Sequence, residues 1–245
     1  MLPSNASEAP SSETGEPTMP VNAIVSYDGT PNDQDALMLA HVLASAGVEP
    51  TLVYVRHSTR AEAAREELEE HEAHALLERG AHWLGDANIA RRVVLSPSTP
   101  EGLQRVAAET RAQLIVFGSE YRTAPGHVAP GRSAQTLLEG GTTAIAIAPA
   151  AYREIDHPPI RSIGVLAARD DEAAAATAAA LGQSLGAGVG TTMAPDLLIV
   201  GSRPEAIPGR VLVSAQSQYL IETAAAPVIV LARAVGLELR PLVSA

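Results

Sequence analysis

The residues of this chain whose types suggest chemistry stand at three points. Asp28 lies in a Tyr-Asp-Gly triplet directly after a short apolar run, and Gly118 and Ser119 end a second apolar run. Gly131 opens a later segment with helical spacing. A carboxylate at the end of a strand can bind a polar ligand, and glycines at the start of a helix let backbone amides approach a phosphate group. These residue types permit a ligand site at the ends of the strands.

The same residues have a second interpretation that involves no ligand. Asp28 and Gly29 are a common turn pair, and Asp28 can also cap the helix that follows. Gly118 and Ser119 are then a strand-to-helix turn, and Gly131 is an ordinary helix start. The residue types alone leave both interpretations open.

Other reactive groups favour a binding protein over an enzyme. The chain has no cysteine, which excludes disulfides, thiolate nucleophiles and cysteine-ligated metals. The sequence Gly-Arg-Ser-Ala-Gln at 131–135 lacks the last glycine of a nucleophile elbow. His71 and His74 stand among glutamates, as expected of an acidic, solvated helix. We therefore expect no catalytic residue and no metal site.

Composition and charge limit the classes of partner that this chain can bind. The chain has 245 residues, 46% of them hydrophobic but only 3% aromatic, and a net charge of −11. This charge opposes binding to nucleic acids and to anionic membranes, and no apolar run is long enough to cross a bilayer. Residues 1–20 resemble neither a signal peptide nor an anchor and are expected to be a disordered tail. We expect a cytoplasmic protein.

The elements that position these residues alternate regularly. Short β-branched runs alternate with helical stretches, which predicts an α/β fold with a parallel five-stranded sheet in the order 3-2-1-4-5 and helices on both faces. Thr99 is expected to cap the third helix. The expected strands are 22–27, 50–55, 91–95, 113–118 and 143–148, and the expected helices are 32–45, 60–85, 100–110 and 132–139.

The second half appears in the sequence as a shortened repeat of the first. Asp-Leu-Leu-Ile-Val-Gly-Ser at 196–202 echoes Gln-Leu-Ile-Val-Phe-Gly-Ser at 113–119. The residues available leave no room for second and third strands, so the edge of its first strand needs a cover from the first domain or from another chain. The expected division is a tail (1–20), a complete domain (21–150), a linker (151–159), a shortened domain (160–235) and a C-terminal tail (236–245).

Residues 24–55 and 98–119 resemble the universal stress protein family. The resemblance implies an adenine-nucleotide-binding type of fold and pairing of domains through their last strands. Within this chain, residues 228–231 would pair antiparallel with 144–147 as a pseudo-dimer, and a homodimer is a further expectation. Members of the family divide into nucleotide binders and non-binders, which differ in a G-x2-G-x9-G-[ST] motif after the fourth strand.

That motif is half present. Gly118 and Gly131 hold the first and third positions, whereas Tyr121 replaces the second glycine and Arg132 replaces the hydroxyl residue, with Ser133 one place later. Arg132 either contacts phosphate or fills the crevice. The residues leave the choice open.

The resemblance also places the rest of a nucleotide. Asp28 would approach the adenine and ribose, Val55 would flank the base, and Ser119 and Ser133 would lie near the phosphates. Two functions follow as expectations. One is a nucleotide-responsive signalling protein that binds ATP or AMP, with magnesium, in the first domain only. The other is an interaction scaffold in which Tyr121 and Arg132 close the crevice. The sequence identifies no protein partner.

The second half is expected to bind no nucleotide. Ala167 and Ala168 occupy the position of the aspartate, Pro204 that of the second glycine, and Ser214 that of the closing glycine. Its expected role is structural.

Overall fold

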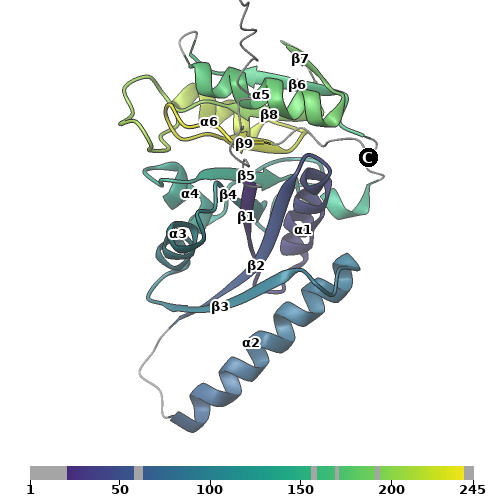
Figure 1. The fold of residues 1–245 in the computed structure, drawn as a ribbon, viewed down its shortest axis with the longest axis vertical. Helices are drawn as coiled ribbons and strands as arrows, with labels where there is room; N and C mark the ends of the chain where they lie inside the picture. The colour runs from purple at the N-terminus through teal and green to yellow at the C-terminus, as the bar shows by residue number, and fades with distance from the viewer. Residues whose placement is uncertain (1–20, 58–62, 156–158, 169–170, 191–193, 240–245) are drawn as a thin grey trace, which may run out of the picture.

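The computed structural model describes residues 21–57, 63–155, 159–168, 171–190 and 194–239. The strands among these residues form one sheet in the order β3-β2-β1-β4-β5-β9-β8-β6-β7 (Figure 1). Neighbouring strands of the first five are all parallel, which confirms the predicted α/β fold and the 3-2-1-4-5 order. These five are β1 (Val21–Ser26), β2 (Val48–His57), β3 (Ala90–Ser96), β4 (Leu114–Gly118) and β5 (Ala144–Ala148).

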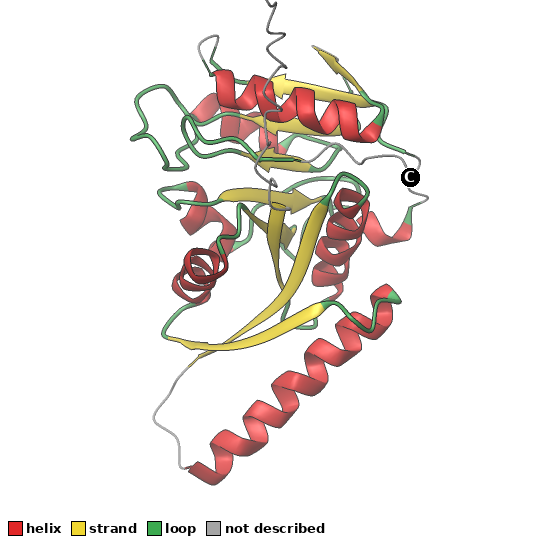
Figure 2. Cartoon of the chain, in the orientation of Figure 1, coloured by secondary structure: helices red, strands yellow, loops and turns green. Residues whose placement is uncertain are grey.

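Helices cover both faces of this part of the sheet (Figure 2). Because side chains alternate along a strand, Val25 of β1 faces α1 and α2, while Ile24 faces α3 and α4. A cluster of buried aliphatic side chains packs on each face of the sheet. The loops at the ends of the strands are therefore attached to a rigid core. The helices are α1 (Pro31–Ala44), α2 (Ala63–Leu84), α3 (Thr99–Thr110) and α4 (Arg132–Leu138).

The cap of α3 differs from the prediction by one residue. Ser98, not Thr99, is the N-cap, and its Oγ accepts a hydrogen bond of 3.4 Å from the Glu101 N–H. Thr99 is already helical, and its Oγ1 lies 3.0 Å from Nε2 of His57 at the end of β2. The threonine hydroxyl therefore joins α3 to the sheet instead of closing the helix end.

The second half adds strands to the same sheet. β6, β8 and β9 run parallel to one another, and β9 pairs antiparallel with β5. Ile145 lies opposite Val230, and Ile147 lies opposite Val228. This confirms the predicted pairing of the two last strands within one chain. The elements are β6 (Ser162–Leu166), α5 (Glu172–Leu185), β7 (Gly188–Gly190), β8 (Leu197–Val200), α6 (Ala215–Glu222) and β9 (Val228–Val230).

One expectation about the second half is wrong. The edge of β6 is covered neither by the first half nor by another chain, because β7 pairs with it in parallel register. β7 has only three residues, and Val189 opposite Ile163 is flanked by Gly188 and Gly190. Glycine has a low strand propensity, so no pattern in the sequence indicated this short strand. The expectation that the second half has no room for a second strand is therefore also wrong.

Both halves repeat one hydrogen-bond pattern. Ser119 Oγ donates to the carbonyl of Ala148 at 2.7 Å and accepts from the Ala129 N–H at 3.1 Å. Ser202 Oγ likewise donates to the carbonyl of Leu231 at 2.7 Å and accepts from the Leu212 N–H at 3.1 Å. In both cases the two partners lie 29 and 10 residues after the serine.

The repeat also crosses the junction between the halves. The Val128 N–H donates to the carbonyl of Ala224, and the Val211 N–H donates to the carbonyl of Gly141. Each loop after the fourth strand of one half thus bonds the turn before the last strand of the other half. This reciprocity is what a two-fold related pair of units would show. That the second half is a shortened copy of the first stays a prediction, which this pattern supports.

Described residues of the expected linker and of the expected C-terminal tail pack against helices of the fold. Asp35 of α1 is fully buried and accepts hydrogen bonds from the Ala151 N–H and from the Arg153 N–H and Nη1, at 2.9 to 3.0 Å. Leu237 is buried, and its N–H donates to Oγ1 of Thr177 on α5. Tail residues 1–20 and 240–245 lie outside the described residues. No helix within the described ranges is long and apolar enough to cross a membrane.

Candidate functional site

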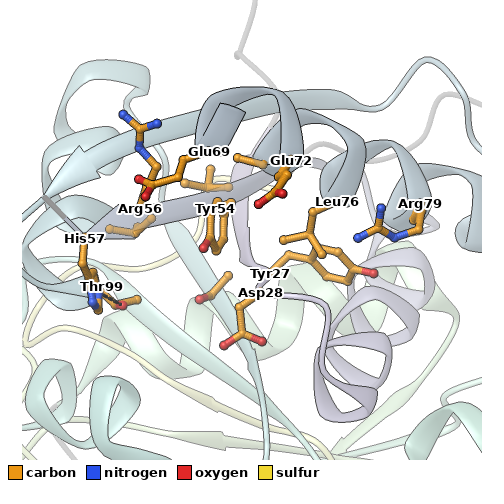
Figure 3. Close-up of a pocket in the computed structure, with 14 residues that line it drawn as sticks. Tyr27, Asp28, Tyr54, Arg56, His57, Glu69, Glu72, Leu76, Arg79 and Thr99 are labelled. Atoms are coloured by element: carbon orange, nitrogen blue, oxygen red, sulfur yellow. Dashed lines mark hydrogen bonds between the residues drawn. The ribbon is translucent and has the colours of Figure 1, made fainter. Parts of the chain in front are cut away.

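A cavity of about 600 Å³ opens at the carboxyl ends of β1 and β2, between these strands and α2 (Figure 3). This end of a parallel α/β sheet is where such folds place ligands, and the volume suits a small molecule. Its lining includes Tyr27 and Asp28 after β1, Tyr54, Val55, Arg56 and His57 of β2, Glu69, Glu72, Leu76 and Arg79 of α2, and Thr99.

The position of α2 keeps the cavity open. α2 packs tightly on the sheet at Gly80, where an added Cβ would be 2.9 Å from Leu52 Cδ2 and 2.9 Å from the Tyr27 ring. Leu76, one turn earlier, approaches the turn at Gly29, where an added Cβ would be 2.5 Å from Leu76 Cδ1. The small residues allow α2 to contact the end of β1 closely, and the cavity lies beside this contact.

The turn after β1 brings two carboxyl groups together. The Thr30 N–H lies 3.2 Å from Asp28 Oδ1 and 3.0 Å from Asp33 Oδ2. The Asp28 N–H also donates to Asp33 Oδ2 at 2.9 Å. Gly29 between them has φ +88°, a left-handed conformation that favours glycine. Asp28 therefore forms part of the turn and also faces the cavity. The turn interpretation and the ligand interpretation of this residue are thus compatible.

This arrangement changes the acidity of the neighbouring groups. Burial, together with the hydrogen bond to Asp28 and its negative charge, raises the pKa of Asp33 to about 8. Burial also raises the pKa of Tyr27, as do the charges of Asp33 and Asp28, while Arg79 opposes the rise. The end of β1 thus holds two acidic groups and a phenol beside one arginine.

Val55 lies at the cavity, but its side chain packs on the opposite face of the sheet. Val55 is buried in the cluster under α3, and an added Cβ at Gly102 would lie 2.8 Å from its Cγ1. It supports the floor of the cavity more than it faces it. The neighbouring side chains Tyr54 and Arg56, which alternate with it, point to the α2 side (Figure 3).

Gly118 and Ser119 lie beside this site and are used by the fold. An added Cβ at Gly118 would be 1.9 Å from the carbonyl oxygen of Asn32 in the first turn of α1, and Asn32 Nδ2 donates to the carbonyl of Ser119. The hydroxyl of Ser119 is bonded to Ala148 and Ala129, as described above, so its side chain is occupied within the protein.

Gly131, Arg132 and Ser133 do not line the cavity at Asp28. Gly131 is the N-cap of α4 with an extended backbone, and no atom lies within 4 Å of an added Cβ. Arg132 is exposed and Ser133 is half-buried. The space beside Gly131 is thus open, as the phosphate interpretation of this residue requires.

The expected closure of the crevice by Tyr121 and Arg132 is wrong. Tyr121 is 69% exposed, and the guanidinium of Arg122 stacks 5.0 Å from its ring centroid. The backbone N–H of Glu120 bonds the carbonyl of Ala129, which directs the loop outward. Both Tyr121 and Arg132 are therefore outside any crevice.

The sequence interpretation missed the part of the site formed by α2. Helical spacing had been visible, because Glu69, Glu72, Leu76 and Arg79 recur every three or four residues on one face. No pattern in the sequence showed that this face would lie over the ends of β1 and β2. Asp33 was also missed, although an acidic residue at the third position of a helix is a known capping signal.

The sequence model of the universal stress protein family matches residues 21–149. The chain belongs to this family. The match covers the first five strands and ends at the close of β5, so the second half of this universal stress protein lies outside it. Among curated proteins, no sequence matches the chain.

Solved structures show the same fold over most of the chain. A universal stress protein from Archaeoglobus fulgidus DSM 4304 is similar with a TM-score of 0.64 and 15% identity, covering 86% of this chain and 98% of its own. A functionally unknown protein from Pseudomonas aeruginosa PAO1 is similar with a TM-score of 0.57 and 10% identity, covering 89% and 94%. At these identities the likeness concerns the fold alone.

The matching glycine of the second half is packed as closely as Gly118. Gly201 directly follows β8, and an added Cβ there would lie 2.4 Å from Asp171 Oδ2 and 2.9 Å from Ala167 Cβ. Asp171 caps α5, its Oδ1 accepting a hydrogen bond from the Ala174 N–H. That this half binds no nucleotide stays a prediction.

Proposed function

We propose that this universal stress protein binds an adenine nucleotide, ATP with magnesium or AMP, in the first-domain cavity at Asp28. The observation that supports this most directly is the cavity itself, of about 600 Å³, at the carboxyl ends of β1 and β2 with Asp28 in its wall. The role is binding and signalling in a stress response, and the proposal assigns no catalytic step to the site.

Different residues bind the two ends of the nucleotide in this proposal. The carboxylate of Asp28 accepts hydrogen bonds from the adenine or ribose, and the half-buried Tyr54 offers aromatic surface beside it. The phosphates extend toward the start of α4, where the Gly131 backbone is open and the exposed Arg132 supplies a positive charge. Binding would then order the exposed loop between Ser119 and Gly131 and change the surface that it presents to a partner.

Equilibrium titration of the purified chain with ATP and magnesium tests the proposal. Saturable binding is expected, and Asp28→Ala is expected to weaken it at least about tenfold, because a charge-assisted hydrogen bond contributes about 1.5 to 3 kcal/mol. Asp86→Asn is the matched control, since Asp86 lies between α2 and β3 at the opposite end of the strands. Absence of saturable binding at millimolar nucleotide contradicts the proposal.

A ligand-free interaction scaffold is the second candidate. It is favoured by the exposed Tyr121 and Arg122 pair on the loop, and by the carbonyl of Asn32, which occupies the space that Gly118 leaves. If the scaffold is correct, proteolysis of the loop proceeds at the same rate with and without nucleotide. Protection of the loop by ATP favours the nucleotide-binding function.

A further inference from the structure

The two carboxyl groups after β1 are close enough to share a proton. One N–H, that of Thr30, lies within 3.2 Å of an oxygen from Asp28 and of an oxygen from Asp33. Two acceptors of one N–H lie on the same side of its nitrogen, so the two carboxyl groups are neighbours in this turn, and a side-chain hydrogen bond links Asp33 to Asp28. Two carboxylates in such proximity do not both ionise readily, so the pair retains one proton where isolated groups would retain none.

The surroundings decide which group holds the proton. Asp33 is half-buried and lies in the first turn of α1, whereas Asp28 is exposed in the cavity wall. Oδ2 of Asp33 accepts the N–H groups of Asp28 and Thr30, which leaves Oδ1 for the proton. Protonated Asp33 can then donate a hydrogen bond to the carboxyl group of Asp28, which lies in the cavity wall.

We propose that Asp33 is a positioning residue for the ligand site: its proton holds the Asp28 carboxylate toward the ligand, and loss of that proton weakens binding. This inference rests on the proposed function of the cavity. It adds that the site offers the ligand an oriented acceptor at neutral pH and a second negative charge at alkaline pH. Since a nucleotide is itself an anion, the second charge also repels it.

Other charged or titratable groups share the cavity wall with Asp28: Arg56 and His57 of β2 and Glu69, Glu72 and Arg79 of α2. Arg79 of α2 faces Tyr27 at the end of β1, and both belong to the environment of the pair. Arg153, which follows β5, donates to the carbonyl of Pro31 but is bound to the buried carboxylate of Asp35. Asp28 is thus the charged group in direct contact with Asp33.

The test compares the pH dependence of ATP affinity in the wild-type chain and in Asp33→Asn. Asparagine keeps an oxygen that accepts the two backbone N–H groups and an amide that donates to Asp28, but it has no proton to lose. Because the pKa of Asp33 is raised to about 8, wild-type affinity should fall about tenfold between pH 7 and pH 9. Asp33→Asn should lose this fall, and Asp86→Asn should keep it.

Identical pH profiles for wild type and Asp33→Asn would overturn the inference. Any titration of the nucleotide itself affects all three chains equally, so the comparison removes it. Matching thermal melts at pH 7 establish that Asp33→Asn is folded.

A second measurement separates this inference from the proposed function. Carbon-13 NMR of the ligand-free chain follows the titration of the Asp33 carboxyl group, which is expected well above its ordinary range in wild type and to return toward that range in Asp28→Ala. If ATP does not bind at all, the proposed function fails, while this titration still decides whether the pair holds a proton. A normal Asp33 titration in a chain that binds ATP overturns the inference alone.

Discussion

At the residue scale, two glycines of one sequence motif have different physical roles. Gly118 is required by packing, because the backbone of Asn32 occupies the space of any side chain at that position. Gly131 has an ordinary negative φ and open space around it, so the fold itself tolerates a side chain there. The motif residues that appear equivalent in the sequence therefore separate into one that serves the fold and one that is available to a ligand.

Gly118→Ala and Gly131→Ala form a matched pair that tests this distinction. Gly118→Ala should lower the free energy of unfolding by about 3 kcal/mol, because its Cβ meets a backbone atom that cannot move without displacing α1. Gly131→Ala should change the free energy of unfolding by less than about 1 kcal/mol. Urea unfolding of both variants measures the difference. Equal losses of stability in the two variants would show that the close contact at Gly118 is not as described.

At the element scale, each half secures its long loop with one buried serine. The hydroxyls of Ser119 and Ser202 join the end of β4 or β8 to the end of β5 or β9, and each also binds the far side of its own loop. The loops are mostly exposed, and backbone hydrogen bonds, such as those from Gly126 to Ala150 and from Gly209 to Arg233, also hold them. The serine in each half is therefore a buried anchor at the base of its loop.

Ser119→Ala and Ser202→Ala should each lower the free energy of unfolding by about 1 to 3 kcal/mol, because each leaves a buried carbonyl and a half-buried N–H without this partner. The two losses should be similar, since the bonds repeat with the same lengths. Thr136→Ala removes an exposed hydroxyl of α4 and should change stability by less than about 0.5 kcal/mol. Thermal melts compare the three variants. A loss for Ser119→Ala without one for Ser202→Ala would contradict the repeated role.

Elements with strong periodicity were predictable, and contacts between them were not. The strand predicted at 143–148 appears as β5, because its buried aliphatic run is continuous. By contrast, β7 depends on the neighbouring edge of β6, and the glycines of β7 give it no pattern of its own. The site follows the same rule. Asp28 was found at the end of its strand, but the cavity depends on how α2 crosses the sheet at Gly80, which sequence spacing does not specify.

At the scale of the whole molecule, the sheet and its two cores are continuous. The cluster on the α1 side combines Leu37 of α1 with Ile163 of β6 and Leu181 of α5. The cluster on the α3 side combines Leu103 of α3 with Val228 of β9. Neither half can unfold without exposing apolar surface of the other.

The described parts of both halves should therefore unfold in one transition. Differential scanning calorimetry should give a single peak whose calorimetric and van't Hoff enthalpies agree. The substitution Ile229→Asp, at a fully buried position of β9 opposite Ala146, should shift the whole peak to lower temperature and leave no part of it behind. Two separable peaks, in either chain, would show that the halves are independent.

The antiparallel contact between β5 and β9 has a consequence for how this protein behaves among its relatives. Because β9 is tethered to β5 by the same polypeptide, the association is unimolecular, and dilution does not release it. A competing chain would have to displace a strand whose local concentration is fixed by covalent linkage. β5 therefore does not exchange its partner strand with other proteins of similar fold, at any expression level of the gene.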